Sequence, residues 1–474
     1  MKDNRTSVKR SLFVSAIALT LTAALLIGST FAWFTSTAST GVSKVEAGKL
    51  KVTLLNDNKE LSSTDVLTWQ KAEGQTGTAL WEPGCTYNLE PITIKNTGSL
   101  ALKYKIVITG IKGDADLNKV IDWTVNDTAL DADHPLAVGE SNELTISGHM
   151  QENADDNYQG KTIDGISITV VATQDTVEYD SNGNQYDKDA EYPIPVTTGD
   201  ELQAIVSNAT APVNIVLTNN ITTNNFVIPA DKDVTLDLNG RTVTNDESHT
   251  ILNKGHLTLT DSSADKSGQI ISCKADTAAL RNGDNAVCVV ESGTISRDGA
   301  NGNTWHTVEN FGTMTFNGGK VIAEDGQSFA IVNGWNYINP GEQKATMTIN
   351  NIEMKAGPNG FKNCAGGTLT MNDGTLHCTG YWGLSNDSTG VATINGGKII
   401  SDKYIAISDG GAKMEINGGT FTGPQGSLYV QDYAQDTVVK GGSYQNETVE
   451  FMQSCCPKGY TAKPEGGMVV VSKD

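Results

Sequence analysis

The sequence predicts an all-β protein of two parts, a β-sandwich followed by a parallel β-solenoid. Three observations predict this arrangement. Short stretches of alternating apolar and polar residues dominate residues 33–192. Glycine is unevenly distributed, with 14 of the 49 glycines in residues 1–192 and 35 in residues 193–474. From residue 193 onward, a pattern marked by glycine recurs every 22 to 33 residues, which is typical of a repeat architecture.

Composition narrows the classes of function that the chain can have. Its 474 residues include 34 Lys and Arg against 55 Asp and Glu, a formal net charge of −21. An acidic chain repels phosphate backbones, so no nucleic-acid partner is expected. Apolar residues make up 38% of the chain, which is enough to bury a core and excludes wholesale disorder.

Residues 1–32 are predicted to be a secretory signal peptide. A basic start precedes the apolar stretch Leu12–Ala32, and small residues occupy Thr30 and Ala32, three positions and one position before a cleavage site at Trp33. The alternative is an uncleaved membrane anchor, because 21 mostly apolar residues can span a bilayer. Either interpretation exports the rest of the chain, so we expect an extracellular matrix or cell-surface location, with membrane contact only through this segment.

Residues 33–178 are predicted to form an antiparallel β-sandwich. Period-two alternation with Thr, Val and Ile indicates strands at Lys49–Leu55, Pro91–Lys95, Leu100–Thr109, Asn142–Ser147 and Ile166–Ala172. One segment, Leu117–Trp123, has some helical character. Several short strands, each with one apolar face, favour two sheets closed on one core.

Several motifs in this part occur in an order that carries a family resemblance. A signal ending in Gly28–Phe34 is followed by Ala47–Leu50, Glu82–Gly84, Ile94–Lys103 and Ile166–Gln174. Over about residues 12–178, the chain resembles the TasA/camelysin family of Gram-positive biofilm matrix proteins. The resemblance implies a jelly-roll sandwich, cleavage by a SipW-type signal peptidase, and self-association or association with other matrix proteins.

The resemblance also implies assembly through a donated N-terminal strand. The mature chain would begin with an assembly strand that includes Trp33, Phe34, Thr35 and Thr37. This segment carries no charge and cannot bury its two aromatic side chains alone, whereas pairing with a neighbour's open sheet edge would bury them. The alternative is a frayed terminus, as at most chain ends.

The sequence contains no complete catalytic or cofactor-binding motif, and no catalytic residue is predicted. Some relatives are classed as metallopeptidases, but none of the six histidines of this chain forms the HExxH motif, so we do not expect peptidase activity. The linker, residues 179–195, places Asp180, Asn182, Asn184 and Glu191 at positions 1, 3, 5 and 12 of a calcium-loop template. Its glycine, Gly183, falls at position 4 rather than 6, and the alternative is a polar hinge.

Residues 196–474 are predicted to form the solenoid, with a cap helix at about 198–207 and a C-terminal cap at about 446–474. The marker positions are Gly240, Gly268, Gly293, Gly319, Ile352, Gly374, Gly397, Gly419 and Gly442. Two residues after them, an apolar column is expected at Thr242, Ile270, Ile295, Val321, Met354, Leu376, Ile399, Phe421 and Tyr444. From the third marker on, two further apolar columns are expected. One lies three residues before the marker and starts at Val290, and the other lies five residues before it and starts at Cys288. Side chains of one column stack about 4.8 Å apart, which builds a continuous core.

An asparagine ladder is expected at one turn of each coil. Its members are Asn253, Asn282, Asn310, Asn333, Asn363 and Asn386, followed by Ser408 and Gln431. Stacked amides can bond from coil to coil, so this ladder is interpreted as structural. The pattern resembles the inner ladder of right-handed parallel β-helices of the pectate-lyase type, a likeness of architecture rather than of activity.

Two groups of residues could carry function on the solenoid. Asp298 and Glu324 repeat one offset in adjacent coils, but an enzyme acting on polysaccharides needs several carboxylates in one groove, and solvated turn residues are the favoured interpretation. The aromatic residues Trp305, Trp335, Tyr337 and Trp382 are the expected glycan platform. The alternative is that these rings point inward or stack on one another.

Together these observations predict a secreted, non-catalytic structural protein of the cell surface or biofilm matrix. Two other functions remain open. One is a glycan-binding adhesin that uses a face of the solenoid, and the other is a polysaccharide lyase or hydrolase.

Overall fold

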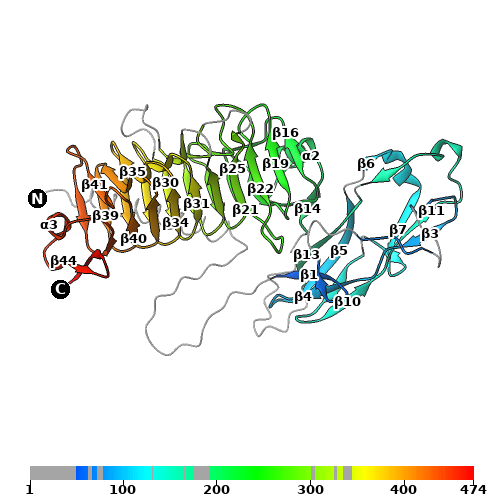
Figure 1. Cartoon of the computed structure of the whole chain (residues 1–474). Helices are drawn as coiled ribbons and strands as arrows, with labels where there is room; N and C mark the ends of the chain where they lie inside the picture. The colour runs from blue at the N-terminus through cyan, green and yellow to red at the C-terminus, as the bar shows by residue number, and fades with distance from the viewer. Residues whose placement is uncertain are drawn as a thin grey trace, which may run out of the picture.

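The computed structural model describes residues 50–61, 67–71, 78–109, 112–130, 132–164, 166–175, 192–299, 305–324, 328–334 and 344–474. Figure 1 shows an N-terminal part of antiparallel strands and a long stack of parallel strands. The N-terminal part covers residues 50–175, and the solenoid runs from residue 194 to 444. The all-β fold class predicted from the sequence is confirmed.

Four small sheets make up the N-terminal part. The first has the order β10 (Ser141–Leu144), β4 (Ile92–Asn96), β1 (Val52–Asn56) and β2 (Lys59–Glu60). The second has the order β3 (Thr86–Asn88), β11 (Ile146–Met150), β7 (Ile121–Val125) and β8 (Thr128–Ala129). The third has the order β13 (Ser167–Gln174), β5 (Leu102–Thr109) and β9 (His134–Leu136). The smallest pairs β12 (Ile163–Asp164) with β6 (Lys112–Gly113).

One apolar cluster joins the three larger sheets. Ile94, Tyr104 and Val125 come from different sheets and are completely buried in this cluster. Alternation along each strand turns the apolar side chains toward this core and the polar ones toward solvent. The arrangement is therefore sandwich-like.

Two predicted segments of this part differ in the structure. Asn142–Ser147, expected as one strand, divides at Thr145 between β10 and β11, which lie in different sheets. The backbone N–H of Thr145 donates to the side-chain oxygen of Asn126 at 2.8 Å, so the strand hydrogen bonding is interrupted there. The segment with helical character begins as a 3-10 helix, η1 (Ala115–Val120), and continues as strand β7. A second 3-10 helix, η2, covers Asp156–Tyr158.

Three parallel sheets form the solenoid. Sheet 1 contains β14 (Ile194–Val196), β15 (Val213–Leu217), β18 (Asp233–Asp237), β21 (His256–Thr260), β24 (Val287–Val290), β27 (Thr313–Phe316), β30 (Thr346–Ile349), β33 (Thr368–Met371), β36 (Val391–Ile394), β39 (Lys413–Ile416) and β42 (Thr437–Val439). Sheet 2 contains β16 (Ile221–Thr223), β19 (Thr242–Asn245), β22 (Gln269–Ser272), β25 (Thr294–Arg297), β28 (Lys320–Ala323), β31 (Glu353–Ala356), β34 (Thr375–Cys378), β37 (Lys398–Ser401), β40 (Thr420–Thr422) and β43 (Gly442–Tyr444). Sheet 3 contains β17 (Val227–Ile228), β20 (Ile251–Asn253), β23 (Leu280–Asn282), β26 (Val308–Asn310), β29 (Phe329–Asn333), β32 (Asn359–Asn363), β35 (Trp382–Asp387), β38 (Ile405–Gly410) and β41 (Leu428–Val430).

Strand registers confirm the predicted core columns, with one correction. The column three residues before the marker pairs in register along Val290, Phe316, Ile349, Met371, Ile394, Ile416 and Val439. In the column after the marker, Ile270 pairs with Val243, and Thr242 instead points outward beside Gln269. The first coil is therefore displaced by one residue, at a turn where Asn239 and Gly240 both have positive φ.

The marker glycine recurs because the backbone requires it. Its φ is positive in coil after coil, for example 86° at Gly319, 108° at Gly374 and 116° at Gly419. Side chains other than glycine rarely adopt this conformation. The glycine that recurs in the sequence therefore lies at the turn that leads the chain from sheet 1 into sheet 2.

Different structures lie at the two ends of the solenoid. Helix α2 (Gly199–Asn208) begins after Thr198, whose hydroxyl accepts the N–H of Glu201, and it buries Leu202 and Val206 against the first coil. At the other end, α3 (Val449–Ser454) precedes the hairpin of β44 (Tyr460–Glu465) and β45 (Met468–Lys473), and β45 pairs antiparallel with β43. None of the helices in the described ranges has the length and apolar composition needed to cross a membrane.

Candidate functional site

Several residues singled out from the sequence lie outside the described residues. They are the cleavage site at Ala32 and Trp33, the assembly strand with Phe34, Thr35 and Thr37, the calcium-loop candidates Asp180, Asn182, Asn184 and Glu191, and the platform residues Trp335 and Tyr337. The predictions that concern them stay predictions.

The inner asparagine ladder runs along the turn after sheet 3. Each amide Nδ2 donates to the Oδ1 of the next coil at 2.7–2.8 Å, through Asn253, Asn282, Asn310, Asn333, Asn363 and Asn386. All six side chains are buried. The ladder predicted from the sequence is confirmed for these coils.

The predicted end of this ladder is wrong. Asn386 pairs with Asp409 rather than Ser408, and the next position is Val430 rather than Gln431. Asp409 accepts the amide of Asn386 at 2.8 Å and the Thr437 hydroxyl at 2.6 Å. A carboxylate accepts hydrogen bonds but has none to donate onward, so it ends the ladder.

A second asparagine ladder, which we did not predict, runs along the outside of the solenoid. Its amides bond at 2.8–2.9 Å through Asn317, Asn350, Asn372, Asn395 and Asn417. Its donors point the opposite way, and the last donor, on Asn317, reaches the carboxylate of Glu291 at 2.8 Å. The signal was present in the sequence, because these residues all stand two positions before the marker.

Trp305 of the expected platform is held by a buried carboxylate that also pairs with a partly exposed arginine. Glu309 is completely buried and accepts the indole N–H of Trp305 at 2.8 Å and a guanidinium N–H of Arg281 at 2.8 Å. Burial raises the pKa of Glu309, and Arg281 partly opposes this shift. A carboxylate of this kind needs such partners, so Trp305 contributes to the packing of this turn.

Burial shifts the pKa of several histidines and cysteines of the solenoid. Burial lowers the pKa of His249 and of His306 to about 4, so both imidazoles are neutral at pH 7. Burial raises the pKa of Cys288 to about 12. Cys288 and Cys378 lie in inward columns, as the repeat predicts, and all seven cysteines are unpaired.

The carboxylates expected at an enzymatic site lie in the turns after sheet 2. Asp298 follows β25 and Glu324 follows β28, each in a neighbouring coil. Within the described ranges, no group of three His, Cys, Asp or Glu side chains is placed to share a metal ion.

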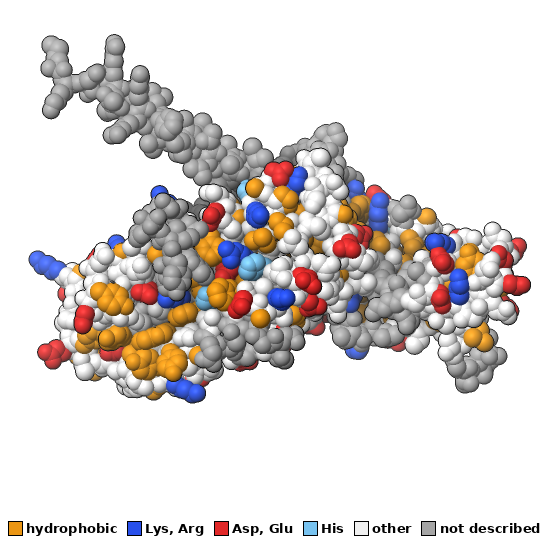
Figure 2. Space-filling view, turned by 90° about the horizontal axis from the view of Figure 1, so that it is seen from above, with side chains coloured by type: hydrophobic (Ala, Val, Ile, Leu, Met, Phe, Trp, Pro, Cys, Tyr) orange, Lys and Arg blue, Asp and Glu red, His pale blue; other side chains and the backbone are white. Residues whose placement is uncertain are grey.

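Five aromatic rings, three of them exposed, gather in and beside the strands of sheet 3 in the last coils. We call this group the aromatic patch, and its members are Tyr381, Trp382, Tyr404, Tyr429 and Tyr433. Trp382 lies edge-on to Tyr404, with ring centres 4.8 Å apart, and nearly parallel to Tyr429, with centres 6.5 Å apart. The exposed fractions are 58% for Tyr381, 46% for Tyr429 and 58% for Tyr433. Figure 2 shows hydrophobic side chains gathered toward this end of the rod.

The patch changes the composition of the expected platform. Trp382 belongs to it, but Trp305 lies three coils away, about 14 Å at the usual strand spacing. The polar residues Ser385 and Ser408 of the neighbouring strands are buried. The outward column of sheet 3 passes from Lys362 through Ser385 and Ser408 to Tyr429.

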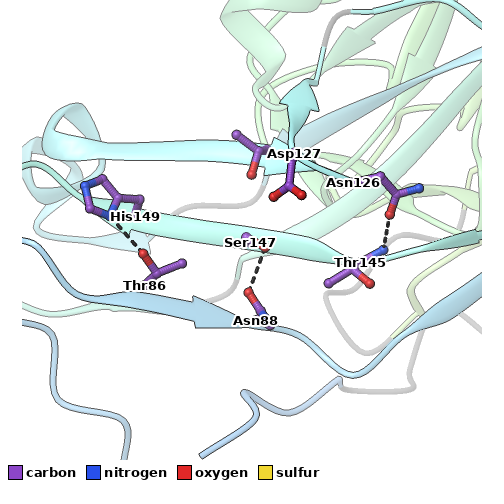
Figure 3. A pocket seen from close by; sticks show the side chains of 8 residues that line it. Thr86, Asn88, Asn126, Asp127, Thr145, Ser147 and His149 are labelled. Atoms are coloured by element: carbon purple, nitrogen blue, oxygen red, sulfur yellow. Dashed lines mark hydrogen bonds between the residues drawn. The ribbon is translucent and has the colours of Figure 1, made fainter.

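A polar pocket of about 670 Å³ lies on the outer face of the second sheet of the N-terminal part. Figure 3 shows its walls, in which Thr86 bonds His149 and the Ser147 hydroxyl donates to Asn88 at 2.7 Å. The remaining lining residues are Thr124, Asn126, Asp127 and Thr145. Four of the eight lining side chains therefore bond one another across the wall.

Comparison with known proteins gives no relatives: no family model, no curated protein and no solved structure matches the chain.

Proposed function

We propose that this chain is a secreted, non-catalytic structural protein of the cell surface or biofilm matrix, in which the solenoid is a stiff rod. The observation that carries the proposal is the inner ladder. It consists of six consecutive buried hydrogen bonds donated by asparagine side chains, and it runs along one continuous apolar core. From β20 to β38, each coil is bonded to the next by these side chains as well as by three sheets, so bending would break many contacts at once.

The use of buried carboxylates supports a structural role. Asp261 accepts the backbone N–H groups of Gly240 at 2.8 Å and Gly268 at 2.6 Å. Glu309 and Asp409 are likewise held by neighbouring coils. A catalytic acid or base must reach a substrate, whereas these three groups are completely buried and hold coils together.

We infer export and assembly from the N-terminal motifs. The signal sequence would direct secretion, and the strand beginning at Trp33 would join an open sheet edge of another subunit or matrix protein. The support is the charge-free composition of this segment and the resemblance to TasA/camelysin proteins.

The test compares a chain that begins at Trp33 with one that begins at Val45. We expect the longer chain to form fibres in electron microscopy and large particles in light scattering, while the shorter one stays monomeric. If both stay monomeric, or both assemble equally, strand donation is wrong. Release of reducing ends or unsaturated products from polysaccharides, lost in Asp298→Asn or Glu324→Gln, would contradict the non-catalytic role.

A further inference from the structure

We propose that the aromatic patch binds neutral glycan chains. The inference goes beyond the structural role and does not depend on the N-terminal strand. The sequence places Tyr381, Trp382 and Tyr404 near the asparagine ladder, and the structure adds Tyr429 and Tyr433 to them.

The exposure of the patch is the first argument. Among the described residues, eight large apolar side chains are exposed, and three of them are Tyr381, Tyr429 and Tyr433. Tyr429 lies in β41 of sheet 3, Tyr381 immediately precedes β35 and Tyr433 follows β41, so the three lie within three consecutive coils. Single exposed apolar residues need no explanation, but a contiguous group marks a binding surface.

The chemistry of the surface fits a sugar. A pyranose ring has an apolar face, which packs on aromatic rings, and a rim of hydroxyls, which both donate and accept hydrogen bonds. The exposed tyrosines carry hydroxyl groups that both donate and accept hydrogen bonds. Ser385 and Ser408, in the neighbouring strands, are buried, and the Gln431 amide donates to Ser408 at 3.1 Å. The carboxylate of Asp387, at the end of the same strand as Trp382, adds a strong acceptor.

The charge of the surface favours a neutral glycan over an anionic one. The nearest cation in the outward column, Lys362, lies 3.3 Å from the carboxylate of Asp387, so their charges cancel. The chain as a whole carries −21 and repels polyanions.

The size of the surface favours an oligosaccharide over a protein partner. The patch spans three coils, which is about 14 Å including the strands themselves. A standard protein interface buries about 800 Å² on each side, which is more than five rings on three coils supply. The coil spacing is close to the length that one sugar adds to an extended chain, so a glycan lying along the rod passes Trp382, Tyr404 and Tyr429 in turn.

The experiment titrates the mature chain with hexasaccharides of β-1,4-linked glucose, mannose or N-acetylglucosamine, and with an oligogalacturonate of the same length. Binding is followed by calorimetry and by tryptophan fluorescence, because Trp382 lies in the patch. We expect at least one neutral hexasaccharide to bind with a Kd below about 1 mM. Tyr381→Ala and Tyr429→Ala should each weaken this binding tenfold or more, and the corresponding trisaccharide should bind more weakly.

The control is Tyr158→Ala, which removes a partly exposed ring from the N-terminal part and should leave binding unchanged. Because Tyr381 and Tyr429 are half exposed, both variants should keep the wild-type melting temperature, which is checked first. The proposal is wrong if no neutral hexasaccharide binds, if the oligogalacturonate binds as well as the neutral chains, or if the patch variants behave like Tyr158→Ala. Loss of self-association in Tyr429→Ala without any glycan binding would mark the patch as a protein contact and would equally overturn the proposal.

Discussion

Ile394 illustrates how each residue of the solenoid is stabilised by two coils at once. It is completely buried and pairs in register with Met371 of the coil before and Ile416 of the coil after. A charge placed there would be enclosed by apolar neighbours on both sides without a partner. We predict that Ile394→Asp lowers the free energy of unfolding by several kcal/mol and abolishes cooperative melting, measured by circular dichroism during heating.

The matched control is Thr370→Asp, in the same sheet but on its outer face. Its neighbours in register, Thr348 and Thr393, are uncharged, so the new carboxylate is solvated. This change should alter stability by no more than about 0.5 kcal/mol. Equal melting of Ile394→Asp and the wild type would mean that the register of the core is wrong.

Single positions also show where sequence reasoning fails. The column after the marker misplaces Thr242 by one residue, and the ladder misplaces Asp409 by one. Periodicity identifies a column only while coil lengths stay regular, and a turn that gains or loses one residue changes the face on which a side chain lies. Asp409 also differs from the asparagines before it in residue type. At the end of the inner ladder the side chain only has to accept the bond from Asn386, and a carboxylate does this.

The two asparagine ladders allow the contribution of a ladder asparagine to stability to be compared between a buried and an exposed position. Asn363 is buried in the inner ladder, where it accepts from Asn333 and donates to Asn386, both at 2.8 Å. Asn372 is exposed in the outer ladder and also makes one bond to each neighbour, at 2.8 Å. The pair differs in access to water and in two further bonds that the Asn363 amide donates, to the carbonyl oxygens of Gly367 at 3.2 Å and Val391 at 3.1 Å.

We predict that Asn363→Ala costs about 1–3 kcal/mol, because the amides on either side lose buried partners that water cannot replace. Asn372→Ala should cost less than about 1 kcal/mol, since water can take over its bonds. Urea unfolding of both variants measures the difference. Equal losses would show that the buried ladder is accessible to water.

Elements of the solenoid were more predictable than those of the N-terminal part. A repeat samples the same local structure many times, so its columns are read from the sequence itself. The division of Asn142–Ser147 between two sheets depends on a hydrogen bond that the Thr145 N–H donates to Asn126, which is distant in sequence. Composition indicates strands, but not which sheet each strand joins.

The candidate site was predicted less well than the fold. Sequence could place Trp382 near other aromatic residues, but it could not show that Glu309 holds Trp305. It also could not show that Tyr381, Tyr429 and Tyr433 stay exposed, because exposure depends on neighbouring turns rather than on the period.

At the scale of the whole molecule, a stack of parallel strands has two ends whose backbone groups are open to other chains. An exposed end is a template for edge-to-edge association. At the C-terminal end, Met452 of α3 and Val469 and Val471 of β45 are buried against the last coil, and β45 occupies the edge of β43. These residues therefore shield the core and one strand edge together.

We predict that a chain truncated after Asn446 associates end to end, because removal of α3 and the hairpin uncovers the apolar side chains of the last coil and the edge of β43. The truncation is made in the chain that begins at Val45, so that strand donation by the N-terminus does not contribute. Light scattering after size-exclusion chromatography should give a mass that rises with concentration. A control that lacks only Lys473 and Asp474, both exposed, should remain monomeric. If the longer truncation is also monomeric and melts as the parent chain does, the C-terminal segment is not what protects the end of the rod.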